Sequence, residues 1–202
     1  RILVDEEIAS PILVGSEEAI QAAAQRLGLD LEGVTVVHPR RSDRFEAYAE
    51  EYLRLRARRG VTPDLARSRL ADPIYFGALM VHLGDADMMV ASAGPHYAES
   101  MRKVLEVIGP APGTSRVSSH YMVLLPKRVV FLADCAVNIR PDAEQLAEIA
   151  LLAARMARSL GIEPRSDARA CTRDVQRETN GMRVAESRGL SKYTRTLRDQ
   201  DK

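Results

Sequence analysis

Arginine side chains gather at two places in the sequence where they could hold an anion. One group lies at the end of a predicted helix and consists of Arg54, Arg56, Arg58 and Arg59. The other is Arg102 with Lys103, on a helix further along the chain. A guanidinium group gives two parallel charge-assisted hydrogen bonds to phosphate oxygens. Cations near a helix C-terminus are also favourable without any ligand. The residues alone therefore leave both an anion site and an ordinary solvated surface open.

A polar turn provides a second candidate. Residues 134–140 follow an apolar run, 129–133, that predicts a buried strand, and Pro141 is expected to open the next helix. Open α/β sheets form ligand crevices where strands end in such turns. Cys135 stands where a nucleophile could lie, but no neighbouring residue activates it, so we expect a packed, unreactive thiol. Asp134 and Asn138 fall at the same rim, and nothing in the sequence gives them a catalytic role.

Several other kinds of chemistry lack their sequence signature. The four histidines show no metal-ligand spacing, which argues against a metal site. Asp85 and Asp87 flank a predicted turn, and turn formation accounts for them better than binding of a divalent cation does. The sequence contains neither a Gly-rich phosphate loop nor a G-x-S-x-G elbow. The catalytic residues are therefore unknown at this point.

Strands and helices alternate along most of the chain. The expected strands cover residues 11–14, 34–37, 88–91, 120–125 and 129–133. The expected helices cover residues 17–27, 42–59, 62 onward, 74–83, 95–108 and 141–160. Ser16 and the pair Thr62–Pro63 supply helix-start signals, and Gly60 supplies a stop. This order predicts an α/β fold, a layered α-β-α arrangement with a mostly parallel sheet.

Composition limits the setting and the partners. The 202 residues carry a net charge of +1, so overall charge favours no particular partner. The two cysteines are widely spaced, and we expect both to be reduced in a cytoplasm. No apolar run is long enough to span a membrane.

Residues 165–202 hold eight Arg and two Lys against six acids but few apolar side chains. They form a basic tail that we expect to be loosely ordered. Its mixed charges, and the presence of only one aromatic residue, Tyr193, argue against nucleic acid.

Several separate motifs follow one another in a recognisable order. They are L-R-x-R-R-G-V-T-P-D-x-A at Leu55 to Ala66, Y-F-G-A-L-M-V-x-x-G-D-A-D at Tyr75 to Asp87, Y-A-x-x-M-R at Tyr97 to Arg102, V-S-S at Val117 to Ser119, and L-P-K, F-L-A-D, V-N and P-D-A-E-x-L-A-E-I-A within Leu125 to Ala150. Together they resemble the phosphate acetyltransferase/butyryltransferase family over about residues 3 to 165. Residues 1–164 are therefore expected to form a partial domain of this kind, truncated at both ends, and residues 165–202 a tail unlike the family.

The resemblance implies a fold and a reaction. The fold is two α/β subdomains around a cleft, of the isocitrate/isopropylmalate dehydrogenase type. The reaction moves an acetyl group between coenzyme A and phosphate, with a carboxylate as base. Two family arginines associated with coenzyme A match Arg56 and Arg102. Arg54, Arg58 and Arg59 match nothing and are expected to be surface charges. The implied partners are acyl-CoA and phosphate, and self-association into a homo-oligomer is expected.

The first functional hypothesis is therefore an acyltransferase-type domain of the phosphate acetyltransferase class, but its departures from the family leave open whether it is an enzyme, and we expect the isolated chain to be inactive. The motif match stops at Arg165, before the Ser-Arg pair and the Asp that family members use for catalysis. One hypothesis is that the tail is an out-of-frame reading. If no single-base shift of the nucleotide sequence restores an apolar strand there, that hypothesis is wrong. The forms Y-A-x-x-M-R, L-L-P-K and V-N most resemble the C-terminal domain of hybrid NADP-dependent malic enzymes. A non-catalytic, acetyl-CoA-responsive regulatory domain is therefore the second functional hypothesis.

Overall fold

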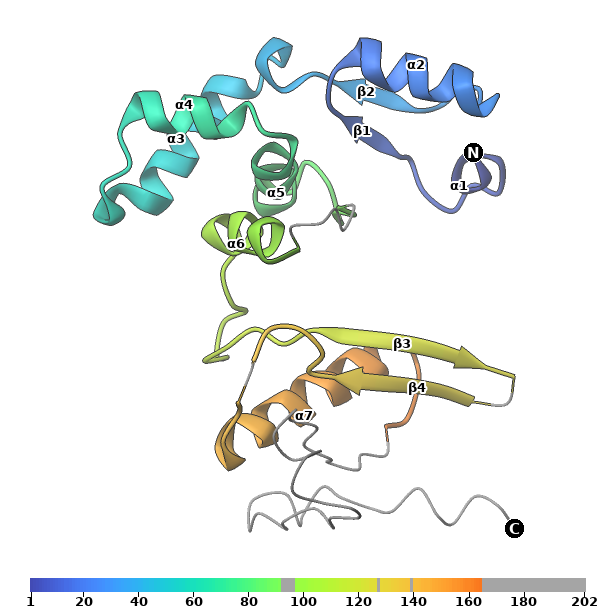
Figure 1. The fold of residues 1–202 in the computed structure, drawn as a ribbon, viewed down its shortest axis with the longest axis vertical. Helices are drawn as coiled ribbons and strands as arrows, with labels where there is room; N and C mark the ends of the chain where they lie inside the picture. The colour runs from blue at the N-terminus through green and yellow to red at the C-terminus, as the bar shows by residue number, and fades with distance from the viewer. Residues whose placement is uncertain (92–96, 127, 139, 165–202) are drawn as a thin grey trace, which may run out of the picture. The chain divides into compact units, whose positions relative to one another are not determined.

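The computed structural model describes residues 1–91, 97–126, 128–138 and 140–164. The chain is an α/β protein that divides into two compact units, an N-terminal unit of residues 1–109 and a C-terminal unit from residue 110. The N-terminal unit (Figure 1) contains α1 (Ile2–Asp5), β1 (Ile12–Val14), α2 (Glu17–Leu27), β2 (Thr35–Val37), η1 (Pro39–Arg41), α3 (Phe45–Arg56), η2 (Ala57–Arg59), α4 (Pro63–Leu70), α5 (Pro73–Leu83) and α6 (Tyr97–Val107). The C-terminal unit contains β3 (His120–Leu125), β4 (Arg128–Ala133) and α7 (Ala143–Ser159). The expectations for residues 165–202, including a boundary at 164/165, lie outside the described residues.

The N-terminal unit begins with a small parallel sheet. Strands β1 and β2 pair in parallel, with Ile12 opposite Thr35, and α2 connects them. The Ser16 side chain accepts a hydrogen bond from the Ala19 N–H at the start of α2, and Gly28 ends the helix in the left-handed conformation. The predicted strand, cap and helix are all confirmed.

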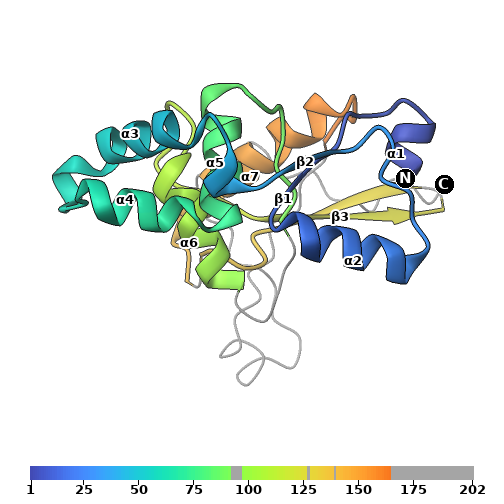
Figure 2. The same cartoon turned by 90° about the horizontal axis from the view of Figure 1, so that it is seen from above.

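Four helices build the hydrophobic core of this unit. The largest side chains with almost no exposure are Tyr48, Tyr52, Leu70, Phe76 and Leu79. They come from α3, α4 and α5, and the buried Val107 adds α6 to the core. Helix α3 lies beside α4 in both views (Figure 1 and Figure 2). Helix α5 is apolar on almost every side and is buried along most of its length.

Local signals fix the ends of these helices. Thr62 accepts a hydrogen bond from Leu65 N–H, and Pro63 occupies the first turn of α4. Gly60 and Gly84 end η2 and α5 with positive φ angles of 74° and 80°. Asp85 receives hydrogen bonds from the Arg44 guanidinium and the Tyr48 hydroxyl. These contacts agree with a structural role for Asp85 in the turn, as expected.

The C-terminal unit is a hairpin with one long helix. Strands β3 and β4 pair antiparallel, with His120 opposite Ala133, and α7 contacts β4. Helix α7 begins at Ala143 behind a capping box, in which Asp142 accepts from Gln145 N–H and the Gln145 side chain accepts from Asp142 N–H. The prediction that Pro141 is the first helical residue is therefore wrong. Pro141 precedes the cap, because the side chain that accepts from the exposed Gln145 N–H group belongs to Asp142.

Three other expectations differ from the structure. Residues 88–91 form no strand. The described strands form two sheets of two strands each, β1 with β2 and β3 with β4. The strand 129–133 is not fully buried, since residues 129–131 are half-buried and Leu132 is 49% exposed. On β3, Leu124 is 71% exposed. Cys135 is an exposed free thiol rather than a packed one. The exposed apolar side chains on β3 agree with the expected self-association, which stays a prediction. Among the described helices, none has the length and apolarity to cross a membrane.

A partly buried carboxylate gives the N-terminal unit a specific acid sensitivity. Glu51 on α3 accepts two hydrogen bonds from Arg54 at 2.7 Å and lies 3.0 Å from His82 Nε2 of α5. The hydrogen bonds from Arg54 outweigh burial and, with His82, lower the pKa of Glu51 from 4.5 to about 2. A carboxyl whose pKa is lower in the folded state stabilises the fold at pH values above its unfolded-state pKa. This contribution is lost as the pH falls from the unfolded-state pKa to the folded-state pKa.

We therefore expect Glu51→Gln to flatten the acid dependence of stability. Between about pH 4.5 and pH 2 the wild-type chain should lose stability more steeply than the variant. In this window the carboxyl of residue 51 takes up a proton when the wild type unfolds, and the variant has no carboxyl there. Urea unfolding at several pH values measures the difference. Parallel curves for the two chains across that window would contradict the assignment.

Candidate functional site

The two arginines singled out by the sequence lie on neighbouring helices of the N-terminal unit. Arg56 is the last residue of α3, and Arg102 lies in the middle of α6, which contacts α3. Arg56 is half-buried, and its Nε–H is buried without a hydrogen-bond partner. Arg102 is exposed. Within the described ranges, neither guanidinium makes a hydrogen bond or an ion pair within 4.0 Å. Both are therefore available to an anionic ligand.

The carboxylate of Glu106 connects the helices that carry these arginines. Its Oε2 accepts hydrogen bonds from the Tyr52 and Tyr75 hydroxyls, both at 2.8 Å, and from Arg69 Nη1 at 3.0 Å. The donors come from α3, α5 and α4, while Glu106 lies on α6. We call these four residues the Glu106 cluster. The cluster joins all four core helices at one oxygen atom.

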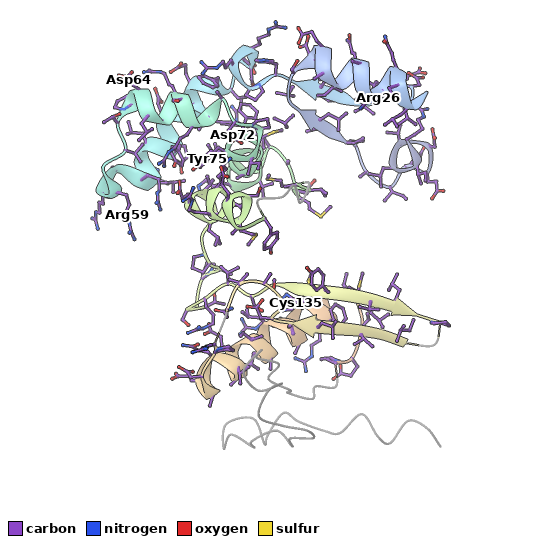
Figure 3. The ribbon with its side chains drawn as sticks, viewed as in Figure 1. Arg26, Arg59, Asp64, Asp72, Tyr75 and Cys135 are labelled. Atoms are coloured by element: carbon purple, nitrogen blue, oxygen red, sulfur yellow. The ribbon has the colours of Figure 1, made fainter. Side chains whose placement is uncertain are left out.

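Aromatic contacts surround the same carboxylate. The rings of Tyr52 and Tyr75 meet edge to face, with centroids 5.4 Å apart. The Arg69 guanidinium lies 5.9 Å from the centroid of each ring. Figure 3 shows Tyr75 on the inner side of this helical group, whereas Arg59 projects outward from η2, beyond the end of α3. The Glu106 cluster therefore belongs to the interior of the N-terminal unit.

The electrostatics of the cluster keep Glu106 charged. Burial by itself pushes the pKa of this carboxyl upward, but the hydrogen bonds from Tyr75 and Tyr52 outweigh it and the pKa is lowered. The charges of Arg69 and Arg56 act in the same direction. Burial raises the pKa of both tyrosine hydroxyls, so they remain protonated donors at neutral pH. Arg69 already pairs with Glu106, so Arg56 and Arg102 supply positive charge beyond what this carboxylate neutralises.

The remaining basic residues of the sequence groups have other roles. Arg54 pairs with Glu51 and is exposed, and Arg58 and Arg59 are exposed residues of η2. Their interpretation as surface charges agrees with this exposure. Lys103 Nζ lies 2.7 Å from Asp72 and 3.1 Å from Glu99, so it anchors α6 to the N-terminus of α5. Arg102 and Lys103, neighbours in the sequence, therefore differ in availability.

A second polar centre lies in the C-terminal unit, in the turn after β4. The Asp134 carboxylate accepts from the Ser119 N–H and hydroxyl and from the Asn138 N–H and side-chain amide. The Ser119 hydroxyl oxygen in turn accepts from the Cys135 and Ala136 N–H groups, each at 2.9 Å. Burial opposes ionisation of Asp134, but these bonds outweigh it and hold its pKa well below the usual range. This carboxylate is fully engaged in holding the turn.

Sequence reasoning placed Asp134 and Asn138 at this rim but did not find their partner. The only signal was the V-S-S motif, which contains Ser119, because the contact joins residues fifteen positions apart across the hairpin. Cys135 Sγ–H donates to the Leu132 carbonyl at 3.3 Å, and the thiol is exposed to solvent. The described surroundings of Cys135 offer no basic group in hydrogen-bond contact with its sulfur.

A hollow of about 330 Å³ lies at the carboxyl end of β2. Its lining consists of Glu17, Val36, Val37, His38, Arg41, Ser42 and Asp43. Arg41 is its only guanidinium, and it faces the Glu17 and Glu18 carboxylates, each at 3.6 Å. Those carboxylates already neutralise Arg41, so the hollow is a weaker candidate for an anion than the surface beside the Glu106 cluster.

Comparison with known proteins agrees with the resemblance seen in the motifs. Residues 1–168 match the family described as phosphate acetyl/butaryl transferase. A phosphate acetyltransferase of Nitratidesulfovibrio vulgaris is 44% identical over 164 residues, which cover 81% of this chain and 23% of that protein. An NADP-dependent malic enzyme of Escherichia coli is 40% identical over 167 residues, covering 81% of this chain and 22% of the enzyme. A phosphotransacetylase structure from Streptococcus pyogenes matches with a TM-score of 0.71 and 32% identity, over 81% of this chain and 50% of that one.

Proposed function

Because this chain belongs to the phosphate acetyl/butaryl transferase family, we propose that Arg56 and Arg102 bind the phosphate groups of coenzyme A. The chain would then supply the coenzyme A-binding part of a phosphate acetyltransferase-type domain, with acyl-CoA and phosphate as its small-molecule ligands. The observation that carries this proposal is the pair of guanidinium groups, without hydrogen-bond or ion-pair partners among described residues, on the adjacent helices α3 and α6.

The physical argument rests on what each guanidinium can gain. Arg56 is half-buried and its Nε–H has lost its water without gaining a protein acceptor. A buried donor without an acceptor costs about 1–3 kcal/mol, which a phosphate oxygen would recover. Arg102 remains exposed and can approach a second phosphate oxygen. Coenzyme A carries several phosphate groups. Two arginines from different helices therefore suit coenzyme A better than they suit a single small anion.

Neither Glu106 nor Asp134 offers a catalytic base. Glu106 accepts three hydrogen bonds, and Asp134 is held by Ser119 and Asn138. A carboxylate that is fully hydrogen-bonded in its charged form is a poor proton acceptor. We therefore propose that these 202 residues bind acetyl-CoA without turning it over on their own.

One observation favours a second candidate function. The matching region of the Escherichia coli protein belongs to an NADP-dependent malic enzyme, of which this chain spans about a fifth. A domain that binds acetyl-CoA without turnover would be suited to regulate such an enzyme. The second candidate is thus an acetyl-CoA-responsive regulatory domain, which shares its binding site with the first.

Two readings on one sample test the proposal. Acetyl-CoA at about 100 times its Kd should stabilise the fold by about 2.7 kcal/mol and raise Tm, because ligand binding favours the folded state. Pantetheine, which lacks the phosphates, serves as the matched control and should leave Tm nearly unchanged. In phosphate buffer, a thiol reagent should detect no release of coenzyme A above the rate without protein. Turnover would contradict the binding-only role, and equal shifts with both ligands would contradict phosphate recognition.

A further inference from the structure

We propose that Glu106 is the positioning residue of the coenzyme A site: through its bond to Tyr52 it fixes Arg56 on α3 relative to Arg102 on α6. This inference rests on the proposed function of the two arginines. Glu106 itself would touch no ligand.

The spacing along the two helices carries the first step. Tyr52 and Arg56 are four residues apart on α3, and Arg102 and Glu106 are four residues apart on α6. Residues four apart lie one above the other on the same helix face. The Tyr52 hydroxyl donates to Glu106 Oε2 at 2.8 Å. This bond therefore connects the two helix faces one turn away from the arginines.

The second step concerns rigidity. The same oxygen also accepts from Tyr75 on α5 and Arg69 on α4, so Glu106 cannot move without breaking three bonds. Tyr52 is fully buried, and the Glu106 side chain is only 15% exposed. Water cannot easily replace bonds at such a site, and buried polar networks that are satisfied hold one geometry. The facing turns of α3 and α6 are thus fixed.

The third step concerns charge. Arg56 is close enough to Glu106 for its charge to act on that carboxylate, yet the two form no ion pair within 4.0 Å. The carboxylate therefore attracts the Arg56 guanidinium toward α6 without occupying its donors. The guanidinium would therefore be oriented before a ligand phosphate binds, which lowers the conformational-entropy cost of binding.

Glu106 could instead be important only for folding, and a matched variant separates the two roles. Glu51 on α3 has a side chain that is 16% exposed, close to the 15% of Glu106, and it too accepts hydrogen bonds from an arginine. Glu51→Gln and Glu106→Gln are therefore similar disturbances of the same helical group. Only the second touches the connection between α3 and α6.

Calorimetric titration with coenzyme A tests the proposal on the full 202-residue chain. Glu106→Gln should weaken binding by about three- to tenfold, which is within the usual coupling of residues in one network. Glu51→Gln should leave affinity unchanged. In an Arg56→Ala background, Glu106→Gln should add no further loss, since the group it positions is gone. An equal loss from Glu106→Gln with and without Arg56 would overturn the proposal.

A ligand-free measurement keeps this inference separate from the proposed function. The Nε–H signal of Arg56 in a ¹⁵N spectrum, identified by its loss in Arg56→Ala, should exchange slowly with water. In Glu106→Gln it should exchange like an exposed arginine, and in Glu51→Gln it should not change. If Glu106→Gln unfolds the chain, Tyr52→Phe removes the same bond between α3 and α6 more gently. Slow exchange that survives both variants would refute positioning, even if coenzyme A binds. Fast exchange with no effect of Arg56→Ala on affinity would refute only the proposed function.

Discussion

Phe76→Ala should destabilise the N-terminal unit by about 3–5 kcal/mol, the usual cost of removing a large aromatic side chain from a core. Phe76 on α5 is 1% exposed. The centroid of its ring lies 4.9 Å from the centroid of the Tyr48 ring on α3. The cavity left by its removal would be lined by helices that the Glu106 cluster already holds in place, so it cannot collapse. A domain is stable by only about 5–15 kcal/mol, so this loss is a large fraction of the total.

Urea unfolding followed by circular dichroism measures this effect as a lower midpoint at an unchanged slope. Leu83→Ala is the control, because Leu83 ends the same helix and is 42% exposed. Its expected cost is about 0.5 kcal/mol, typical of a surface substitution. Similar losses of stability for the two variants would contradict the burial of Phe76 in the core.

Arg56→Ala and Arg102→Ala should each weaken coenzyme A binding by about ten- to hundredfold, corresponding to one lost charge-assisted contact of about 1.5–3 kcal/mol. The loss should shrink as salt increases, more for Arg102 because it is exposed and Arg56 half-buried. Titration calorimetry at two salt concentrations measures both effects.

The neighbouring arginines provide the control for this prediction. Arg58→Ala and Arg59→Ala remove the same charge from the exposed turn η2 directly after α3. They should change affinity by less than about threefold, which is the range of long-range screened charge effects. Equal losses at all four positions would indicate general attraction to a basic surface rather than a site.

The parts of the fold that sequence predicted correctly depend on neighbouring residues. Ser16 at the start of α2, Thr62–Pro63 at the start of α4 and Gly60 at the end of η2 act within one helical turn. Their chemistry can therefore be read from a few letters. The strands expected at 120–125 and 129–133 were predicted for the same reason, since three residues separate these two apolar runs.

The errors share a different cause. A run of four apolar residues at 88–91 suits a strand or a loop over a core, and Met89 packs against the core without pairing to any described strand. The buried character expected of 129–133 depends on what covers the hairpin, which periodicity does not reveal. At α7, proline and aspartate both signal a helix start, and the aspartate side chain decided it.

Site geometry was the least accessible feature. Family motifs indicated Arg56 and Arg102, but the bond that relates them joins Tyr52 and Glu106, 54 residues apart. Glu106 lies outside every motif, and its role appears only once α3 and α6 are side by side. Ser119, the partner of Asp134, does lie in the V-S-S motif, but its contact joins the residue just before β3 to the residue just after β4 and appears only once the two strands pair.

The central claim is that two arginines of this family member recognise coenzyme A. Its most direct test is one calorimetric titration of coenzyme A into three chains: wild type, Arg56→Ala/Arg102→Ala, and Arg58→Ala/Arg59→Ala. The account predicts saturable binding with one ligand per chain in the first and third. It predicts no saturation in the second over the same concentration range. Equal affinity in all three chains, or no saturable binding to the wild type, would contradict it.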